Sequence, residues 1–461
     1  MIRYLLADQD FYKSFFKLAL PITVQYFISA SLNLVDNIMV GQLGTIELAA
    51  GGLANQVYFL LLLFLLGISG GASIFAAQFW GKKDLPNTRR ILGLGLMISG
   101  GASLLFFLIS VFNSQAILRL FSQDRSVIEL GAEYLRITSF TYPMTAITAC
   151  YAAVLRSIGE VKLPMRVNLI AIVINTVLNY LLIFGHFGLP QLGVAGAAIA
   201  TLIARLVETA ALLAASFHHP NRLASKPAEM FRISVLLTKR FISTTGIVVA
   251  KDLIWALGMV LYMVIYAKMG TEVVASINIV STTRQLLFVL FNGIAGACLV
   301  MVGNQIGAGD EPKAFLYSKR FLIITTITGI FTGILTALGS GLILAPYKIT
   351  ASVFQQSQAI LLMNALFLPA TVINMVAVVG ILRSGGDIMF CLIMDLVAVY
   401  LIGMPLAILG QSVWNYPVEG VFVLISLQEI FKMVLCLKRF LSKRWINNLV
   451  NDFGNPAIIS E

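Results

Sequence analysis

The chain contains little charge. Of its 461 residues, 11% are Asp, Glu, Lys or Arg, and 59% are hydrophobic. A soluble globular domain carries about 25% charged residues, so a soluble fold of this composition would lack the polar side chains needed to cover its core. The composition therefore excludes an ordinary soluble domain and predicts a protein that uses lipid as its solvent.

Cysteine and histidine are also scarce, with four and three residues. The cysteines lie far apart in apolar stretches, so no disulfide or zinc-site spacing exists. Three histidines exclude the His-rich and HExxH-type sites of membrane enzymes, and no glycine motif ends in Gly-Lys-Ser/Thr. The sequence thus argues against an enzyme and predicts no bound cofactor.

Apolar stretches of membrane-spanning length fill most of the chain. A helix needs about 20 apolar residues to cross the hydrocarbon core, and turn residues such as Gly185 and Pro190 divide the longest stretches. The fold class predicted is an all-α membrane protein of twelve transmembrane helices. We place them near residues 14–40, 49–79, 91–113, 127–155, 163–186, 193–216, 239–268, 272–306, 319–345, 352–381, 388–410 and 418–440.

The net charge of +11 resides mainly in alternate loops between these helices. In that position it indicates membrane topology and not nucleic-acid binding, because Lys and Arg concentrate on the cytoplasmic side. Both chain ends fall on the basic side, which agrees with an even number of helices. We expect a multi-pass protein of the cell (inner) membrane with both termini cytoplasmic. The other loops contain only Arg119, Arg125, Lys268 and Lys348.

Glycine, proline and acidic residues recur at an offset near 226 residues. Gly44-Thr45 matches Gly270-Thr271, and Gly81 and Asp84 match Gly307 and Asp310. Two six-helix bundles with one orientation should be related by a pseudo-two-fold axis along the membrane normal. The predicted domains are an amino-terminal lobe (1–216), a cytoplasmic linker (217–240) and a carboxyl-terminal lobe (241–461).

Several motifs in this order resemble the multidrug and toxic compound extrusion (MATE) family over nearly the whole chain. This resemblance implies a transporter that exports organic cations and other amphipathic compounds in exchange for H⁺ or Na⁺, working by alternating access. The motifs are Val35-Asp36-Asn37-Ile38-Met39-Val40-Gly41, Leu155-Arg156-Ser157-Ile158-Gly159, Asn175-x3-Asn179, Leu192-Gly193-Val194-Ala195-Gly196 and Leu382-Arg383-Ser384-Gly385-Gly386-Asp387.

The first candidate site is in the amino-terminal lobe. The resemblance implies that Asp36 belongs to a cation-coupling site, with Asn175, Asn179 and Thr201 as its companions. Asn175 and Asn179 share one helix face. These groups would supply hard oxygen ligands for Na⁺, or a carboxylate that holds a proton. The family often has a second acid where this chain has Asn179, so the coupling ion stays open.

A second set of charged residues lies in the predicted helices of the other lobe. A charge at the centre of a membrane helix costs roughly 2.5 to 3.5 kcal/mol on insertion scales, so it is rarely accidental. We assign coupling or substrate binding to this set, or a buried ion pair that holds the helices in register. Lys251 and Asp252 are neighbours that should not face each other, so we expect Asp252 or Asp395 to pair with Arg284.

Pro21 is the candidate hinge, since a proline frees a backbone carbonyl and permits a kink. The partners expected are a small-molecule substrate and membrane lipid, with no nucleic acid, and the protein is expected to be a monomer. The alternative function is a flippase for a lipid-linked precursor. Such flippases tend to have a more cationic cleft, for which only Lys251 and Arg284 qualify here.

Overall fold

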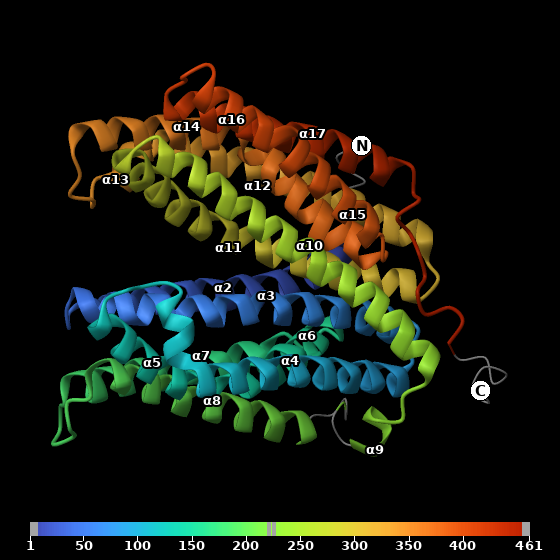
Figure 1. Cartoon of the computed structure of the whole chain (residues 1–461). Helices are drawn as coiled ribbons and strands as arrows, with labels where there is room; N and C mark the ends of the chain where they lie inside the picture. Colours follow the sequence, from blue (N-terminus) through green and yellow to red (C-terminus); the bar gives the residue numbers. More distant parts are fainter. Residues whose placement is uncertain (1–7, 219–222, 224–226, 454–461) are drawn as a thin grey trace. The chain divides into compact units, whose positions relative to one another are not determined.

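The computed structural model describes residues 8–218, 223 and 227–453, and all regular structure in these ranges is helical (Figure 1). The helices are α2 (Gln9–Gly41), α3 (Thr45–Gly81), α4 (Leu85–Arg119), α5 (Arg125–Ser139), α6 (Thr141–Ser157), α7 (Lys162–Phe184), α8 (Gly193–His218), α9 (Pro227–Met230), α10 (Val235–Lys268), α11 (Thr271–Gly307), α12 (Glu311–Leu338), α13 (Ser340–Leu344), α14 (Ala351–Met375), the π-helical η1 (Val376–Leu382), α15 (Ile388–Asp395), the π-helical η2 (Leu396–Gly403), α16 (Met404–Ser412) and α17 (Val418–Leu441).

The twelve predicted spans are confirmed as helical segments. Among the described residues, ten helices are long and apolar enough to cross a membrane; the other two predicted spans are α2 and the pair α5 and α6. The predicted helix 127–155 is interrupted at Phe140. Pro143 lies three residues later and cannot donate the backbone hydrogen bond that a continuous helix needs.

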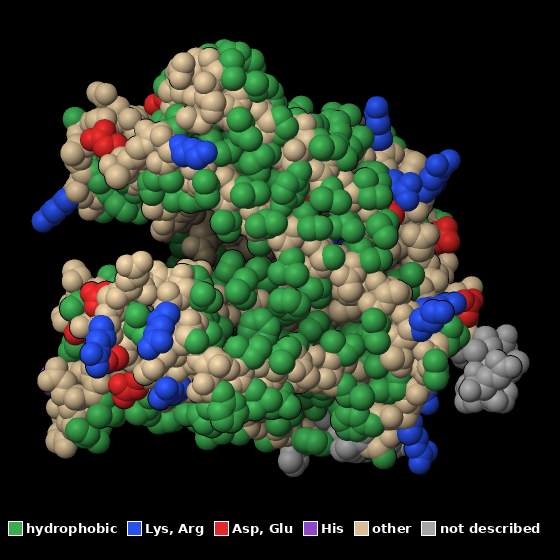
Figure 2. All heavy atoms as spheres, viewed as in Figure 1, with side chains coloured by type: hydrophobic (Ala, Val, Ile, Leu, Met, Phe, Trp, Pro, Cys, Tyr) green, Lys and Arg blue, Asp and Glu red, His purple; other side chains and the backbone are tan. Residues whose placement is uncertain are grey.

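Side-chain chemistry along the helices agrees with a membrane location. In the view of Figure 2, hydrophobic side chains gather over the middle of the helices in each part of the chain. Lys and Arg side chains lie mostly toward the helix ends. An apolar band between charged ends is the pattern that a bilayer selects.

The chain forms two compact units, here called the amino-terminal unit (residues 24–249) and the carboxyl-terminal unit (residues 1–23 and 250–461). The first turns of α2 belong to the carboxyl-terminal unit because Phe11 packs against Tyr317 and Phe321 of α12, with ring centroids 5.0 and 5.4 Å apart. The first turns of α10 belong to the amino-terminal unit, where Phe241 packs on Phe75. The compact units therefore differ from the predicted lobes at α2 and α10.

The predicted linker 217–240 is only partly described. Its residues 219–222 and 224–226 lie outside the described part of the chain, whereas the short helix α9 falls within it. α10 begins at Val235, a few residues earlier than expected.

The sequence repeat reappears as repeated local structure in the two units. α3 and α11 each contain 37 residues, from Thr45 and Thr271. The next helix in each unit is capped by an aspartate: Asp84 accepts a hydrogen bond from the Asn87 N–H, and Asp310 accepts one from the Lys313 N–H, both at 3.1 Å. The match of acids at this offset thus reflects a shared N-cap. The pseudo-two-fold axis stays a prediction.

Gly159 and Gly386 explain the second repeated motif. Both lie in the turn after a helical segment and have φ values of 88° and 70°. This left-handed region favours glycine because it has no Cβ. The matching motifs therefore encode the same turn in each unit.

Candidate functional site

Asp36 faces the interior of the amino-terminal unit. Its Oδ1 accepts a 2.7 Å hydrogen bond from Asn179 Nδ2 on α7. Asn179 is 1% exposed, and its own side-chain oxygen is buried with no hydrogen-bond partner among the described residues. A carboxylate thus lies beside a buried acceptor that has no donor, an arrangement that a bound cation or proton would satisfy.

The other two predicted companions of Asp36 lie beside this pair. The side-chain amide of Asn175 is 3.3 Å from Thr201 Oγ1 and 3.3 Å from Asn179 Nδ2. If the amide is turned so that its nitrogen faces Asp36, it donates to Asp36 Oδ1 at 3.3 Å while its oxygen accepts from Thr201. The structure therefore brings Asp36, Asn175, Asn179 and Thr201 together from α2, α7 and α8.

A second polar layer joins the same three helices. Glu208 on α8 is 7% exposed; its Oε1 accepts a 3.1 Å hydrogen bond from Asn168 Nδ2, and its Oε2 pairs with Arg205. Asn168 Oδ1 in turn accepts from Ser29 on α2 at 3.4 Å. The pairing of Arg205 with Glu208 follows from their spacing on one helix face, but the role of Asn168 could not be inferred from sequence.

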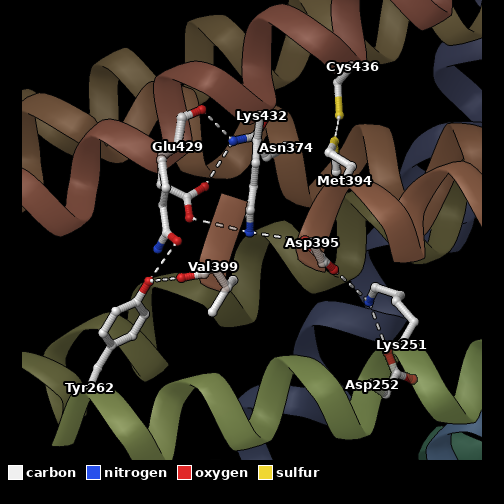
Figure 3. A network of polar contacts seen from close by, with 11 residues as sticks. Lys251, Asp252, Tyr262, Asn374, Met394, Asp395, Val399, Glu429, Lys432 and Cys436 are labelled. Atoms are coloured by element: carbon white, nitrogen blue, oxygen red, sulfur yellow. Dashed lines mark hydrogen bonds and ion pairs between the residues drawn. The ribbon is translucent and has the colours of Figure 1, made fainter. Parts of the chain in front are cut away.

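The carboxyl-terminal unit contains a larger charged network, shown in Figure 3. Lys432 Nζ on α17 lies 3.0 Å from Asp395 Oδ1 and 3.8 Å from Glu429 Oε1. Asp395 and Lys432 are 4% and 6% exposed. Asn374 Nδ2 donates to Glu429 Oε2 at 2.9 Å, so the Glu429 carboxylate also has a neutral partner.

The network continues to α10. Lys251 Nζ lies 2.9 Å from Asp252 Oδ1 and 3.8 Å from Asp395 Oδ2. Arg383 lies 3.3 Å from the other oxygen of Asp252. Each carboxylate of this network therefore faces at least one basic group, as buried charges require.

Two predictions about these charges were wrong. Lys251 does contact its neighbour Asp252, because the four-carbon lysine side chain can fold back along the helix surface. The expected pairing of Asp252 or Asp395 with Arg284 is replaced by pairing with Arg383 and Lys432. The Arg284 guanidinium instead lies 5.4 Å from the centre of the Phe288 ring.

Sequence reasoning also missed Glu429 and Lys432. Both lie within the last predicted span, where any charge marks a candidate functional residue, and their i, i+3 spacing places them on one helix face. The same test that selected Asp252 and Asp395 would have found them.

Pro21 lies inside α2, close to the point where this helix leaves one compact unit and enters the other. A proline inside a helix removes one backbone hydrogen bond and weakens the helix locally. The hinge prediction thus falls at the boundary between two differently packed parts of α2.

The chemistry available around Asp36 is that of hard oxygen ligands. Carboxylate, amide and hydroxyl oxygens suit a hard cation such as Na⁺, and the same carboxylate can hold a proton. Among the described residues, no group of three or more His, Cys, Asp and Glu could hold a metal ion. Any Na⁺ at this site would therefore rely on amide and hydroxyl oxygens in addition to Asp36.

Relatives of the chain cover almost its whole length. It is 22% identical over 442 residues to the uncharacterized transporter YisQ of Bacillus subtilis, covering 95% of this chain and 96% of YisQ. It is 26% identical over 451 residues to the probable multidrug resistance protein NorM of Agrobacterium fabrum, covering 93% and 94%.

Solved structures share the fold. A Vibrio cholerae MATE transporter, VcmN, superposes with a TM-score of 0.86 at 19% identity, covering 94% of this chain and 97% of VcmN. A transporter of the MOP superfamily from Pyrococcus furiosus gives a TM-score of 0.83 at 19% identity, covering 94% and 95%.

The family model MatE matches residues 21–181 and 247–409, which is most of the chain and both copies of the repeat. These matched segments contain Asp36, Asn175, Asn179, Asp252 and Asp395. Members of this family are transporters and not enzymes. The chain therefore belongs to the MatE family and is a multi-pass membrane transporter.

Proposed function

We propose that this transporter is a cation-coupled antiporter that exports cationic or amphipathic small molecules by alternating access. The observation that carries the proposal is the pairing of Asp36 with Asn179, whose side-chain oxygen is buried beside the carboxylate without a donor among the described side chains. A site of this kind is complete only when a small cation or a proton occupies it. The names of the NorM relatives, which refer to multidrug resistance, support the substrate class.

Coupling follows from competition at Asp36. A cation that enters from the outside neutralises the carboxylate, and a cationic substrate then loses its attraction to the same charge. After the cation leaves on the cytoplasmic side, the carboxylate attracts the next substrate. One charge crossing 100 mV supplies about 2.3 kcal/mol, enough to drive a modest uphill export.

Pro21 is proposed as the hinge of this cycle. Occupation of Asp36 changes the charge near one end of α2, and the missing backbone hydrogen bond at Pro21 allows the helix to bend below it. Both termini are proposed to lie in the cytoplasm of a cell whose inner membrane holds the protein as a monomer.

The charged network of the carboxyl-terminal unit is the second proposed coupling or substrate site. Lys251, Asp252 and Asp395 belong to it, and Arg284 lies near Glu429 of the same unit. The pairing of each carboxylate with a base suits a site in which a substrate cation displaces a lysine. The same pairing argues against a pyrophosphate-binding flippase, since the lysines of the network already have anionic partners.

The test is efflux of a fluorescent organic cation from proteoliposomes that contain the purified protein. A pH gradient and a Na⁺ gradient are imposed in separate experiments, each with the membrane potential clamped. Export driven by either gradient supports antiport and identifies the coupling ion. Export that ignores both gradients, with active protein verified by substrate binding, contradicts the proposal.

A further inference from the structure

The polar side chains of α2, α7 and α8 form two layers. On α2, Ser29 and Asp36 are seven residues apart, and on α7 Asn168 and Asn175 have the same spacing. On α8 the corresponding pair is Thr201 and Glu208. Seven residues make about two helical turns, or about 10 Å, so each helix contributes at least one side chain to each layer.

The layer of Glu208 is closed by its own hydrogen bonds. Both carboxylate oxygens have partners, one from Arg205 and one from Asn168, and Ser29 donates to Asn168. The layer of Asp36 is incomplete in the described residues, since none of them donates to the Asn179 oxygen. One layer is therefore satisfied without any ligand, whereas the other is not.

Arg205 lies between the two layers. It is four residues after Thr201 and three before Glu208 on α8, so all three share one helix face. The charge of its guanidinium also acts on Asp36, and the Tyr58 hydroxyl on α3 faces the guanidinium. Tyr134 on α5 also interacts with Asp36, and it carries no positive charge.

In each cycle, an antiporter of this type must change back from the inward-open to the outward-open state while Asp36 is free of the coupling cation. A buried carboxylate without a counter-charge costs several kcal/mol, and a bulky substrate cannot make close contacts with it in every case. A basic side chain on a neighbouring helix would lower this cost, provided that it withdraws when the cation returns. Arg205 has a second carboxylate to which it can withdraw.

We propose that Arg205 is a tethered cation that pairs with Glu208 while the coupling cation occupies Asp36, and that turns toward Asp36 when the coupling cation has left. In the described structure Arg205 pairs with Glu208, which is the partner that the proposal gives it in the first of these two states. Glu208 is then the residue that keeps the guanidinium away from Asp36. This inference rests on the proposed role of Asp36 in coupling.

The test compares Glu208→Gln with the double variant Glu208→Gln/Arg205→Gln in the efflux assay. Glu208→Gln removes the alternative partner, so the guanidinium should stay at Asp36, compete with the coupling cation and reduce exchange by about tenfold. Removing the guanidinium as well should restore exchange to the level of Arg205→Gln alone. The proposal would be overturned if the double variant exchanges no faster than Glu208→Gln. A purely structural ion pair predicts this result.

A matched control is the Arg89–Glu229 pair of the same unit, which also joins a buried arginine to a glutamate. Glu229→Gln and Glu229→Gln/Arg89→Gln should show no such rescue. Rescue at this pair too would mean that the effect reports stability alone, and it would overturn the proposal.

If Glu208→Gln fails to fold, Arg205 variants carry the test. Arg205→Lys keeps the charge and should retain most exchange. Arg205→Met keeps the length but not the charge and should lose about threefold. This loss is smaller than that of Glu208→Gln, because no guanidinium then competes with the coupling cation at Asp36. Equal exchange by these two variants refutes the tethered cation. Normal exchange by Asp36→Asn instead refutes the proposed function itself, so the two failures are distinguishable.

Discussion

The side-chain amide of Asn179 donates a 2.7 Å hydrogen bond to Asp36 and so ties α7 to α2 within the amino-terminal unit. Within the part of the chain that the structure describes, the Asn179 oxygen has no donor, which leaves a buried acceptor next to a carboxylate. Polar groups in this state are rare in native proteins and call for an explanation. The coupling cation proposed above would supply that explanation.

Asp36→Asn should reduce ion-driven efflux by about tenfold or more, because the neutral amide can neither hold a proton nor balance Na⁺. The protein should still insert and remain monodisperse, since asparagine preserves the shape of the side chain. Efflux from proteoliposomes and size-exclusion chromatography measure the two properties. Glu129→Gln, at an exposed ion pair on α5, is the matched control and should leave efflux unchanged.

Pro21→Ala should slow exchange severalfold without lowering stability, because alanine restores the backbone N–H that proline lacks and stiffens α2. The measurements are the efflux rate and the thermal unfolding temperature in detergent. Pro86→Ala is the control: Pro86 lies in the first turn of α4, where the N–H has no partner within the helix. Normal exchange by Pro21→Ala would show that bending at this residue is not needed.

Lys432→Met should lower the free energy of unfolding by about 3 to 5 kcal/mol, because it leaves the buried Asp395 without its closest base. The double variant Lys432→Met/Asp395→Asn should lose less, since it removes both charges together. Thermal unfolding in detergent measures the difference. Lys438→Met, at an exposed position of the same helix α17, should have little effect; a loss as large as that of Lys432→Met would contradict the argument.

The pair of Asp8 with Arg320 makes a pH-dependent contribution to stability. The hydrogen bond from Arg320 holds the pKa of Asp8 below its usual value. Because the folded pKa lies below the unfolded value of about 3.9, the pair stabilises the fold above that pH. The contribution is lost as the pH falls through the lowered pKa.

Asp8→Asn should therefore reduce the free energy of unfolding by at most about 1 kcal/mol near neutral pH, as expected for a partly exposed pair. The difference from the parent protein should disappear at about pH 2. Thermal unfolding across this pH range is the measurement. Asp10→Asn, at an exposed neighbouring residue, should change stability by about 0.5 kcal/mol or less. A constant difference at all pH values would contradict the ion-pair explanation.

Trp445→Ala should destabilise the carboxyl-terminal unit by about 3 to 5 kcal/mol. Trp445 follows α17, is 0% exposed and donates from its indole N–H to the Phe440 carbonyl at 3.1 Å. Its backbone also lies close to Gly385, where an added Cβ would clash with it. Thermal unfolding measures the loss, and Trp414→Ala, at a 46% exposed tryptophan, is the control with an expected change near zero.

The layout of the fold was open to prediction because membrane insertion depends on local composition. Apolar length and the alternation of basic loops gave twelve spans without tertiary information. The break at Phe140 was less visible, since Pro143 alone does not decide between a kink and an interruption. The passage of α2 from one compact unit to the other depends on contacts of Phe11 with α12 that no local pattern contains.

The sequence by itself determined the helical membrane fold and its repeat, because hydropathy, helix caps and glycine turns are local properties of the chain. The companions of Asp36 were expected only from the resemblance to the MATE family. The tertiary structure alone decided which charges meet. Asp395 pairs with Lys432 and Asp252 with Arg383, since the partner of a buried charge depends on how helices distant in sequence pack together. The electrostatic interaction of Arg205 with Asp36 is likewise a result of packing, because the two residues lie on different helices.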